Sequence, residues 1–208
     1  MVFVCSFVSI GGMKDLMPKI TGETREEHIP LMFDEGMSIL VNYIDEHKEI
    51  NRILEIGTAV GWSAMCMANV RDSIMIDTVE IDLDMAEAAV HNIRENGMQD
   101  RIRVHHIDAL WYDTATVYDL IFVDAAKAQY ENYTEHFLKN THPGTVFVYD
   151  NLSFHGIVDD PALSDNRSTI QLTRKIREFR TWLSEDERFE TEWMMDKGDG
   201  IAFAKVKG

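Results

Sequence analysis

The stretch that most constrains the fold of this chain is residues 52–65. It begins Arg-Ile-Leu-Glu-Ile, an apolar run with one acid, Glu55, which predicts a buried β-strand. Gly57 and Gly61 then enclose a three-residue turn, after which residues 62–70 have a helical composition. Free backbone amides at a helix N-terminus suit an anionic group, and an acid beside the glycines suits an amine or hydroxyls. The stretch therefore predicts a strand, turn and helix that bind a small ligand.

The rest of the chain repeats this alternation of strand and helix. Strands are expected at residues 52–56, 74–81, 101–107, 118–123, 145–149, 189–195 and 201–206. Helices are expected at residues 34–46, 62–70, 83–96, 130–138 and 168–187. The order predicts an α/β, doubly wound, seven-stranded and mostly parallel sheet that ends in an antiparallel C-terminal hairpin. In such sheets a ligand binds at the carboxyl ends of the strands, near the point where the strand order reverses.

Composition limits the class of protein. The 36 acidic residues outnumber the 20 basic ones, and the formal charge of −16 argues against a broadly basic nucleic-acid surface, although not against a local basic patch. Two cysteines cannot build a disulfide framework, which favours a cytoplasmic protein. The apolar residues 1–10 lack a basic start and are too short to span a bilayer. We expect an N-terminal extension, 1–22, one domain, 23–208, and no membrane partner.

Polar residues follow the ends of five successive expected strands. They are Glu55, Glu80 with Asp82, Asp108, Asp124, and Asp150 with Asn151. A single acid at the end of a strand is usually a turn or cap residue. Five in succession favour one shared crevice, because the carboxyl ends of parallel strands meet at one edge of the sheet.

The first strands suggest a nucleoside site. Glu80 lies nineteen residues after Gly61, close to the spacing at which an acid bonds ribose hydroxyls beyond a glycine turn. Ala59 occupies the place of the middle glycine of a dinucleotide fingerprint, so a pyrophosphate is less well accommodated. A nucleoside without phosphates is favoured over a nicotinamide cofactor.

The later strands suggest a metal site. Asp124, Asp150 and Asn151 offer three hard oxygen ligands, which suit Mg²⁺ or Ca²⁺. Lys127 follows Asp124 by three residues and, beside a dication, could accept a proton from a substrate hydroxyl. The alternative is that Lys127 only solvates the start of a helix.

These motifs together resemble the metal-dependent O-methyltransferases, the family of the catechol and caffeoyl-CoA enzymes. The matching segments are Glu-Ile-Gly-Thr-Ala-Val-Gly-Trp-Ser at 55–63, Val-Glu-Ile-Asp at 79–82, Phe-Val-Asp-Ala-Ala-Lys-Ala-Gln-Tyr at 122–130 and Tyr-Asp-Asn at 149–151. The resemblance implies a Rossmann-like class I methyltransferase fold, S-adenosylmethionine as cofactor, a divalent ion such as Mg²⁺, Ca²⁺ or Mn²⁺, and a homodimer. Many plant members carry an acid where this chain has Ala126, so any role of that acid is absent here.

The resemblance also implies a role for each matching residue. The metal ligands would be Asp124, Asp150 and Asn151, and the general base would be Lys127. The ribose would be bound by Glu80, and the adenine lined by Asp108 and Ala109. The cofactor's methionine end would be surrounded by Glu55, Gly57 and Ser63, with Gly61 and Asp124 also in the cofactor site.

The substrate is the least constrained element. Asp-Ala-Ala-Lys at 124–127 and Gly-Asp-Gly at 198–200 are most similar to bacterial tRNA 5-hydroxyuridine methyltransferases, which make 5-methoxyuridine at the wobble position. A basic run could contact phosphates or could be a solvated helix face balanced by nearby acids. It comprises Arg167, Arg174, Lys175, Arg177 and Arg180. A small catechol or other vicinal-hydroxy compound is the alternative substrate. A nucleotide-cofactor oxidoreductase and a non-catalytic nucleoside-binding protein are the alternative functions.

Overall fold

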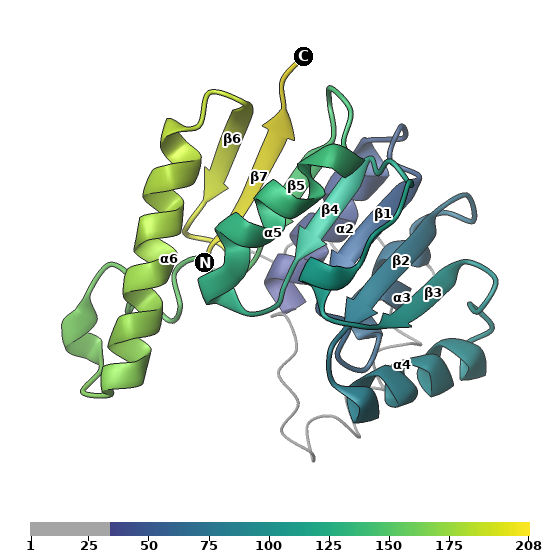
Figure 1. The fold of residues 1–208 in the computed structure, drawn as a ribbon, viewed down its shortest axis with the longest axis horizontal. Coiled ribbons are helices and arrows are strands. Elements are labelled where there is room, and N and C mark those ends of the chain that lie inside the picture. Colours follow the sequence, from purple (N-terminus) through teal and green to yellow (C-terminus); the bar gives the residue numbers. More distant parts are fainter. Residues whose placement is uncertain (1–33) are drawn as a thin grey trace, which may run out of the picture.

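The structure is a computed structural model that describes residues 34–208. Its seven strands form one sheet in the order β3-β2-β1-β4-β5-β7-β6 (Figure 1). The strands are β1 Arg52–Ile56, β2 Met75–Glu80, β3 Ile102–His106, β4 Leu120–Val123, β5 Val146–Tyr149, β6 Phe189–Met194 and β7 Ile201–Val206. The helices are α2 Asp34–Glu46, α3 Trp62–Ala68, α4 Leu83–Glu95, α5 Tyr130–Phe137 and α6 Arg167–Glu185. Short 3₁₀ turns are η1 Ala109–Trp111, η2 Lys127–Gln129, η3 Leu138–Asn140 and η4 Pro161–Leu163.

Strands β1 to β5 are mutually parallel, and β7 and β6 complete the sheet antiparallel to their neighbours. The predicted fold class is therefore confirmed. The expected extension, 1–22, lies outside the described residues. Within residues 34–208, no helix is both long and apolar enough to cross a membrane.

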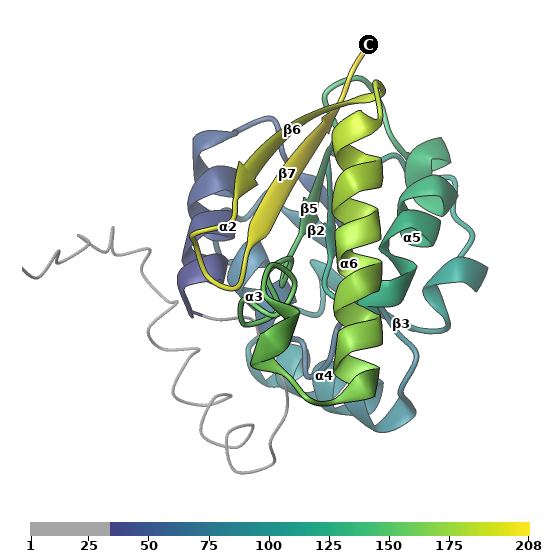
Figure 2. The same cartoon turned by 90° about the vertical axis from the view of Figure 1, so that its left-hand side faces the viewer.

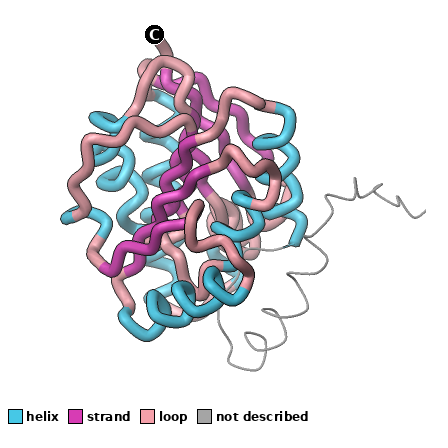
Figure 3. Tube along the Cα trace, turned by 90° about the vertical axis from the view of Figure 1, so that its right-hand side faces the viewer, coloured by secondary structure: helices cyan, strands magenta, loops and turns pink. Residues whose placement is uncertain are grey.

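Helices cover both faces of the sheet, which is why β4 and β5 have no charged residue. All four residues of β4, and all four of β5, are buried. Apolar residues of α2, α3 and α4 pack on one face, and those of α5 and α6 on the other. Figure 2 shows the sheet nearly edge-on between α2 and α6, and Figure 3 shows the magenta strands running between cyan helices.

Local capping sets the helix boundaries. Asp82 precedes α4 and accepts a hydrogen bond from the Met85 amide at 3.0 Å. Asn166 caps α6 through the amides of Ser168 and Thr169, so this helix begins at Arg167, one residue earlier than expected. The acid that sequence analysis places at the end of β2 is thus the start signal of the next helix.

The strand order reverses between β1 and β4, and the two strands are hydrogen-bonded neighbours at this point. The turn after β1 presses against the end of β4. Gly57 has φ 99°, and a Cβ added there would lie 2.1 Å from the backbone oxygen of Asp124. Only glycine fits, because any side chain would meet both a backbone clash and a left-handed backbone conformation. This contact brings the predicted cofactor turn beside the predicted metal site.

We predict that Gly57→Ala is much more destabilising than Gly97→Ala. Gly97 also has a positive φ, 69°, but nothing lies within 4 Å of an added Cβ. Gly97→Ala should therefore cost about 1 kcal/mol for the backbone conformation alone, and Gly57→Ala about 3 kcal/mol or more. Equilibrium urea unfolding measures both, and equal losses would contradict the close approach.

Candidate active site

A cavity of about 620 Å³ opens at the carboxyl ends of β1, β2, β4 and β5. This volume is typical of sites for small molecules and cofactors. Six of the residues singled out by sequence analysis line it: Gly57, Ser63, Glu80, Asp124, Lys127 and Asn151. Sequence positions almost a hundred residues apart therefore share one cavity, at the predicted edge of the sheet.

Glu55 lies directly behind the cavity wall. It lies two residues after Ile53 and on the same face of β1, so its side chain points toward α3, where it is fully buried. The Ser63 hydroxyl donates to one carboxylate oxygen, and the Thr78 hydroxyl donates to the other at 2.5 Å. Burial raises the pKa of Glu55 to about 8, although both hydroxyls act in the opposite direction. A cationic group bound nearby would favour the ionised carboxylate.

Glu80 fastens the turn after β1. One carboxylate oxygen accepts the Ala59 amide and the other accepts the Asp82 amide, both at 2.9 Å. Each oxygen retains a second lone pair, and Glu80 lines the cavity. Glu80 thus shapes the glycine turn and can also accept hydrogen bonds from ligand hydroxyls.

Three other predicted cofactor residues do not line the cavity. Asp108 accepts the Leu110 amide at 2.9 Å and caps η1, and Ala109 is buried. Gly61 precedes α3 with φ 83°, and it lies close to Ala89 of α4. Gly61 is therefore a turn residue, and contact of Asp108 and Ala109 with adenine stays a prediction.

The end of β4 carries the partly buried Asp124, and the end of β5 carries the fully buried Asp150. Burial raises the pKa of Asp124, although the nearby Lys127 ammonium, 3.6 Å from its carboxylate, opposes this. Burial, and then the charge of Asp124, raise the pKa of Asp150 to about 7. Oδ2 of Asp150 is buried and has no hydrogen-bond partner. A cation at this position would satisfy the unpaired oxygen and relieve the repulsion between the carboxylates.

The donor set fits a hard divalent ion. Within residues 34–208, no three His, Cys, Asp or Glu side chains are grouped as a metal site. A metal here would therefore use the carboxylates of Asp124 and Asp150, the amide oxygen of Asn151, and oxygens of water or substrate. Mg²⁺ and Ca²⁺ prefer such ligands.

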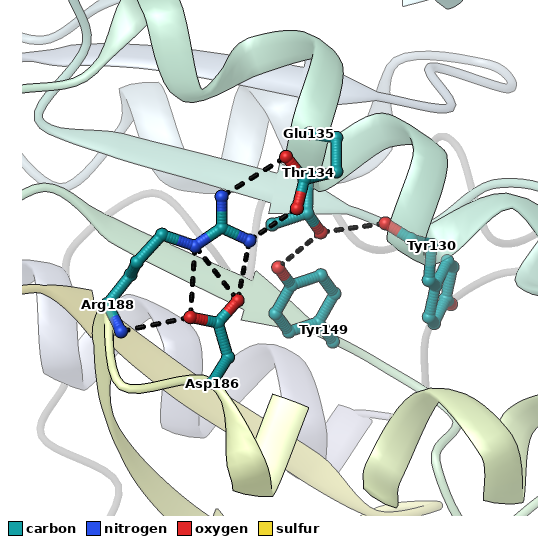
Figure 4. Close-up of polar contacts among 6 residues, drawn as sticks. All are labelled: Tyr130, Thr134, Glu135, Tyr149, Asp186 and Arg188. Atoms are coloured by element: carbon teal, nitrogen blue, oxygen red, sulfur yellow. Dashed lines mark hydrogen bonds and ion pairs between the residues drawn. The ribbon is translucent and has the colours of Figure 1, made fainter. Parts of the chain in front are cut away.

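A hydrogen-bonded layer supports the end of β5 from α5 (Figure 4). The Tyr130 hydroxyl donates to the backbone oxygen of Asp150 at 2.9 Å. Thr134 donates to the Tyr130 carbonyl and accepts from the Tyr149 hydroxyl, each at 2.7 Å. The motif at 122–130 ends at Tyr130 without indicating a role for it, and in the structure Tyr130 holds the backbone of a predicted metal ligand.

The same figure shows how α5 is tied to the segment between α6 and β6. Arg188 donates to both carboxylate oxygens of Asp186, at 2.9 and 2.6 Å, and to Glu135 on α5. Charge-assisted bonds with this bidentate geometry define orientation as well as distance. Helix α5 is therefore bonded to the end of β5 through Tyr130 and to the segment before β6 through Glu135.

Unusual backbone conformations are concentrated at the cavity. Within residues 34–208, the non-glycine residues with positive φ are Ala59, Asn151, Phe154 and His155. All four line the cavity. Such conformations cost free energy and persist only where neighbours enforce them, which is typical of ligand sites.

The turn between β6 and β7 contributes a residue that sequence analysis did not predict. Asp199 is buried at the cavity wall and accepts hydrogen bonds from the Asn151 side chain and the His155 amide. The sequence predicts only a hairpin at the edge of the sheet here. The position of Asp199 between two glycines was the one local signal of a special role. Its contact with Asn151 joins residues 48 positions apart, so no local pattern could predict it.

Four members of the basic run on α6 form ion pairs or hydrogen bonds with other residues of this protein. Arg174 and Lys175 both pair with Glu178, at 3.4 and 2.9 Å. Arg180 pairs with Asp159 at 2.9 Å, and Arg177 donates to the Val158 carbonyl at 3.1 Å. These contacts favour the interpretation of the run as a balanced helix face rather than a phosphate-binding surface.

Comparison with known proteins agrees with this geometry. Residues 13–207 match the family model described as O-methyltransferase. A catechol O-methyltransferase from Niastella koreensis is 29% identical over 171 residues, covering 76% of this chain and 75% of that protein. Caffeoyl-CoA O-methyltransferase 2 from Populus trichocarpa is 27% identical over 190 residues, covering 81% of this chain and 75% of the plant protein.

Two solved structures are similar over nearly the whole chain. A Staphylococcus aureus protein, provisionally named a caffeoyl-CoA O-methyltransferase, has a TM-score of 0.86 at 26% identity, covering 95% of this chain and 93% of that one. TomG from Streptomyces achromogenes, an O-methyltransferase solved with S-adenosylmethionine, has a TM-score of 0.76 at 26% identity, covering 93% and 90%. The chain therefore belongs to the O-methyltransferase family and is an S-adenosylmethionine-dependent O-methyltransferase.

Proposed function

We propose that this protein methylates one of two adjacent oxygens of a substrate that a divalent metal ion holds at Asp124, Asp150 and Asn151. The observation that carries the proposal is the unpaired, buried carboxylate oxygen of Asp150, beside Asp124 and behind a cavity that Asp124 and Asn151 line. The similar proteins named for catechol and caffeoyl-CoA substrates support the choice of acceptor.

The cofactor would occupy the half of the cavity formed by the turn after β1 and the end of β2. Glu80 would accept hydrogen bonds from the ribose hydroxyls through its remaining lone pairs. Ser63 and Glu55 would face the methionine end, where a buried carboxylate suits the ammonium group. Gly57 lets this turn approach the backbone of Asp124, which would lie between the cofactor and the acceptor.

The metal ion, best matched by Mg²⁺ with Mn²⁺ or Ca²⁺ as alternatives, would lower the pKa of a substrate hydroxyl and fix its orientation. Lys127 would supply the general base, because its ammonium nitrogen lies beside Asp124 in the cavity wall. In its uncharged form Nζ takes the hydroxyl proton. The substrate oxygen then forms a bond to the methyl carbon as the bond from that carbon to sulfur breaks, and the sulfonium becomes a neutral thioether.

Two acceptors fit this chemistry, a small catechol and the 5-hydroxyuridine of tRNA. Both place two oxygens on adjacent carbons. The paired basic side chains of α6 favour the small molecule. The segments 124–127 and 198–200, which resemble the tRNA enzymes, support the second. Family resemblance also supports a homodimer, which light scattering would test.

A methyl-transfer assay tests the proposal as a whole. With labelled S-adenosylmethionine, a catechol and a 5-hydroxyuridine-containing tRNA are offered as alternative acceptors, with and without EDTA. We expect transfer to the catechol that EDTA abolishes and excess Mg²⁺ restores. Transfer that survives EDTA would contradict the metal site, and transfer only to tRNA would reverse the order of the acceptors.

Lys127→Met should lower kcat by about 10²- to 10⁴-fold, the usual contribution of a general base. Binding of S-adenosylhomocysteine, measured by calorimetry, should change less than about twofold, because the cofactor half is intact. Lys139→Met is the matched control, since Lys139 forms an exposed ion pair with Asp113 outside the cavity. Unchanged kcat in Lys127→Met would reject the assigned base.

Affinity for S-adenosylhomocysteine should rise with pH between 6 and about 8. With its pKa raised to about 8, the Glu55 carboxyl is protonated at pH 6 and becomes charged as the pH passes 8. The ligand's ammonium group binds the charged form better, so the affinity gains up to about tenfold per pH unit below that pKa and then levels off. Glu55→Gln should remove this dependence. Calorimetry at several pH values measures the affinity for S-adenosylhomocysteine. The same pH dependence in Glu55→Gln would show that another group causes it.

A further inference from the structure

Asp199 is a buried acid without a role in the function proposed above. Its side chain is only 6% exposed, and it reaches the cavity from the turn between β6 and β7. An acid is rarely buried to this degree unless its oxygens are hydrogen-bonded. The partners of Asp199 therefore indicate what it does.

Both oxygens of the Asp199 carboxylate accept hydrogen bonds from the segment that follows β5. Oδ2 accepts from the side-chain nitrogen of Asn151 at 3.3 Å, and Oδ1 accepts from the His155 amide at 2.6 Å. In an amide side chain only the nitrogen can donate a hydrogen bond. The amide of Asn151 must therefore turn its NH₂ toward Asp199 and its oxygen away from it.

The backbone of the same turn fixes the carboxylate in place. The Asp199 carbonyl accepts the Ser153 amide at 2.8 Å, and the Gly200 carbonyl accepts the Leu152 amide at 2.9 Å. A Cβ at Gly200 would lie 2.5 Å from the Ser153 hydroxyl, so the two segments are in direct contact. The strained residues Asn151 and His155 are thus held from one side by a single turn.

We propose that Asp199 is a positioning residue, which directs the amide oxygen of Asn151 toward the metal position and holds the wall formed by Phe154 and His155. The inference rests on the metal site of the proposed function. One carboxylate then connects a metal ligand to the part of the cavity wall that faces the acceptor. If Asp199 had a purely structural role, its replacement would only lower the stability of the fold. The positioning role predicts weaker metal binding while cofactor binding persists.

Asp199→Asn tests this with almost no change in size. An amide offers one acceptor oxygen where the carboxylate offers two, so one of the two contacts must be lost or the Asn151 amide must rotate. We expect the calorimetric Kd for Mg²⁺ or Mn²⁺ to rise 10- to 100-fold, the usual effect of removing a group that orients a metal ligand. The Kd for S-adenosylhomocysteine should change less than about twofold, which also verifies that the variant is folded.

Asp196→Asn is the matched control, because it removes the same charge from an exposed position of the same turn. Its metal Kd should equal that of the unmodified protein. The double variant Asp199→Asn with Asn151→Asp should recover at least tenfold of the lost affinity. The new carboxylate can accept from the new amide and still offer an oxygen to the metal. A double variant that binds no better than Asp199→Asn would overturn the orienting role.

A measurement on the unmodified protein keeps the test independent of variant folding. In a ¹⁵N NMR spectrum, the side-chain NH₂ of Asn151 should exchange slowly with solvent, with and without Mg²⁺; rapid exchange would reject the contact. If the unmodified protein binds no divalent metal, the proposed function and this inference fail together. If it binds metal and Asp199→Asn binds it equally well, the inference alone fails.

Discussion

The contact of Gly57 with the backbone of Asp124 is the constraint on which the rest of the site depends. It lies where the strand order reverses, between the two central strands. On one side are the glycine turn, Glu55 and Glu80, and on the other Asp124 and the end of β5. Because the two backbones touch, a group bound in one half is within reach of a group bound in the other. Methyl transfer requires this proximity, and orientation of the reacting atoms supplies much of the acceleration in such reactions.

Electrostatics distinguish the two halves. In the first half, burial is the largest cause of the raised Glu55 pKa, the charges of Asp124 and Glu80 add to it, and hydroxyl groups satisfy both oxygens. In the second half, the charge of Asp124 adds to the burial of Asp150, and one oxygen of Asp150 is left without a partner. A single positive charge suits the first environment and a divalent cation suits the second. The two halves thus favour different ligands although both are acidic.

Sequence alone could predict much of this molecule, for reasons that are visible in particular residues. The run Arg52–Ile56 gave the exact bounds of β1, because an apolar run that ends at glycine has few alternatives. Asp124 and Lys127 were expected at the carboxyl edge of the sheet, and both line the cavity there, since the end of a parallel strand defines one edge of the sheet.

Other features depend on tertiary contacts that no local pattern encodes. The bond between Asn151 and Asp199 forms only when the final hairpin docks against β5. Asn151 and His155 have left-handed backbone conformations, and because neither residue is a glycine, the sequence gives no signal for them. The basic run on α6 was ambiguous for the same reason, because its partner Asp159 belongs to a separate loop.

The position of β7 has a consequence for how the molecule is assembled. β7 lies between β5 and β6 in the sheet, and it follows both of them in the chain. Strands β1 to β4 are complete once residue 123 has been synthesised. The loop after β5 meets its supporting turn only after residue 200 has left the ribosome. The segments around the cavity are therefore synthesised in a fixed order, and the wall after β5 lacks its supporting turn until the last hairpin is complete.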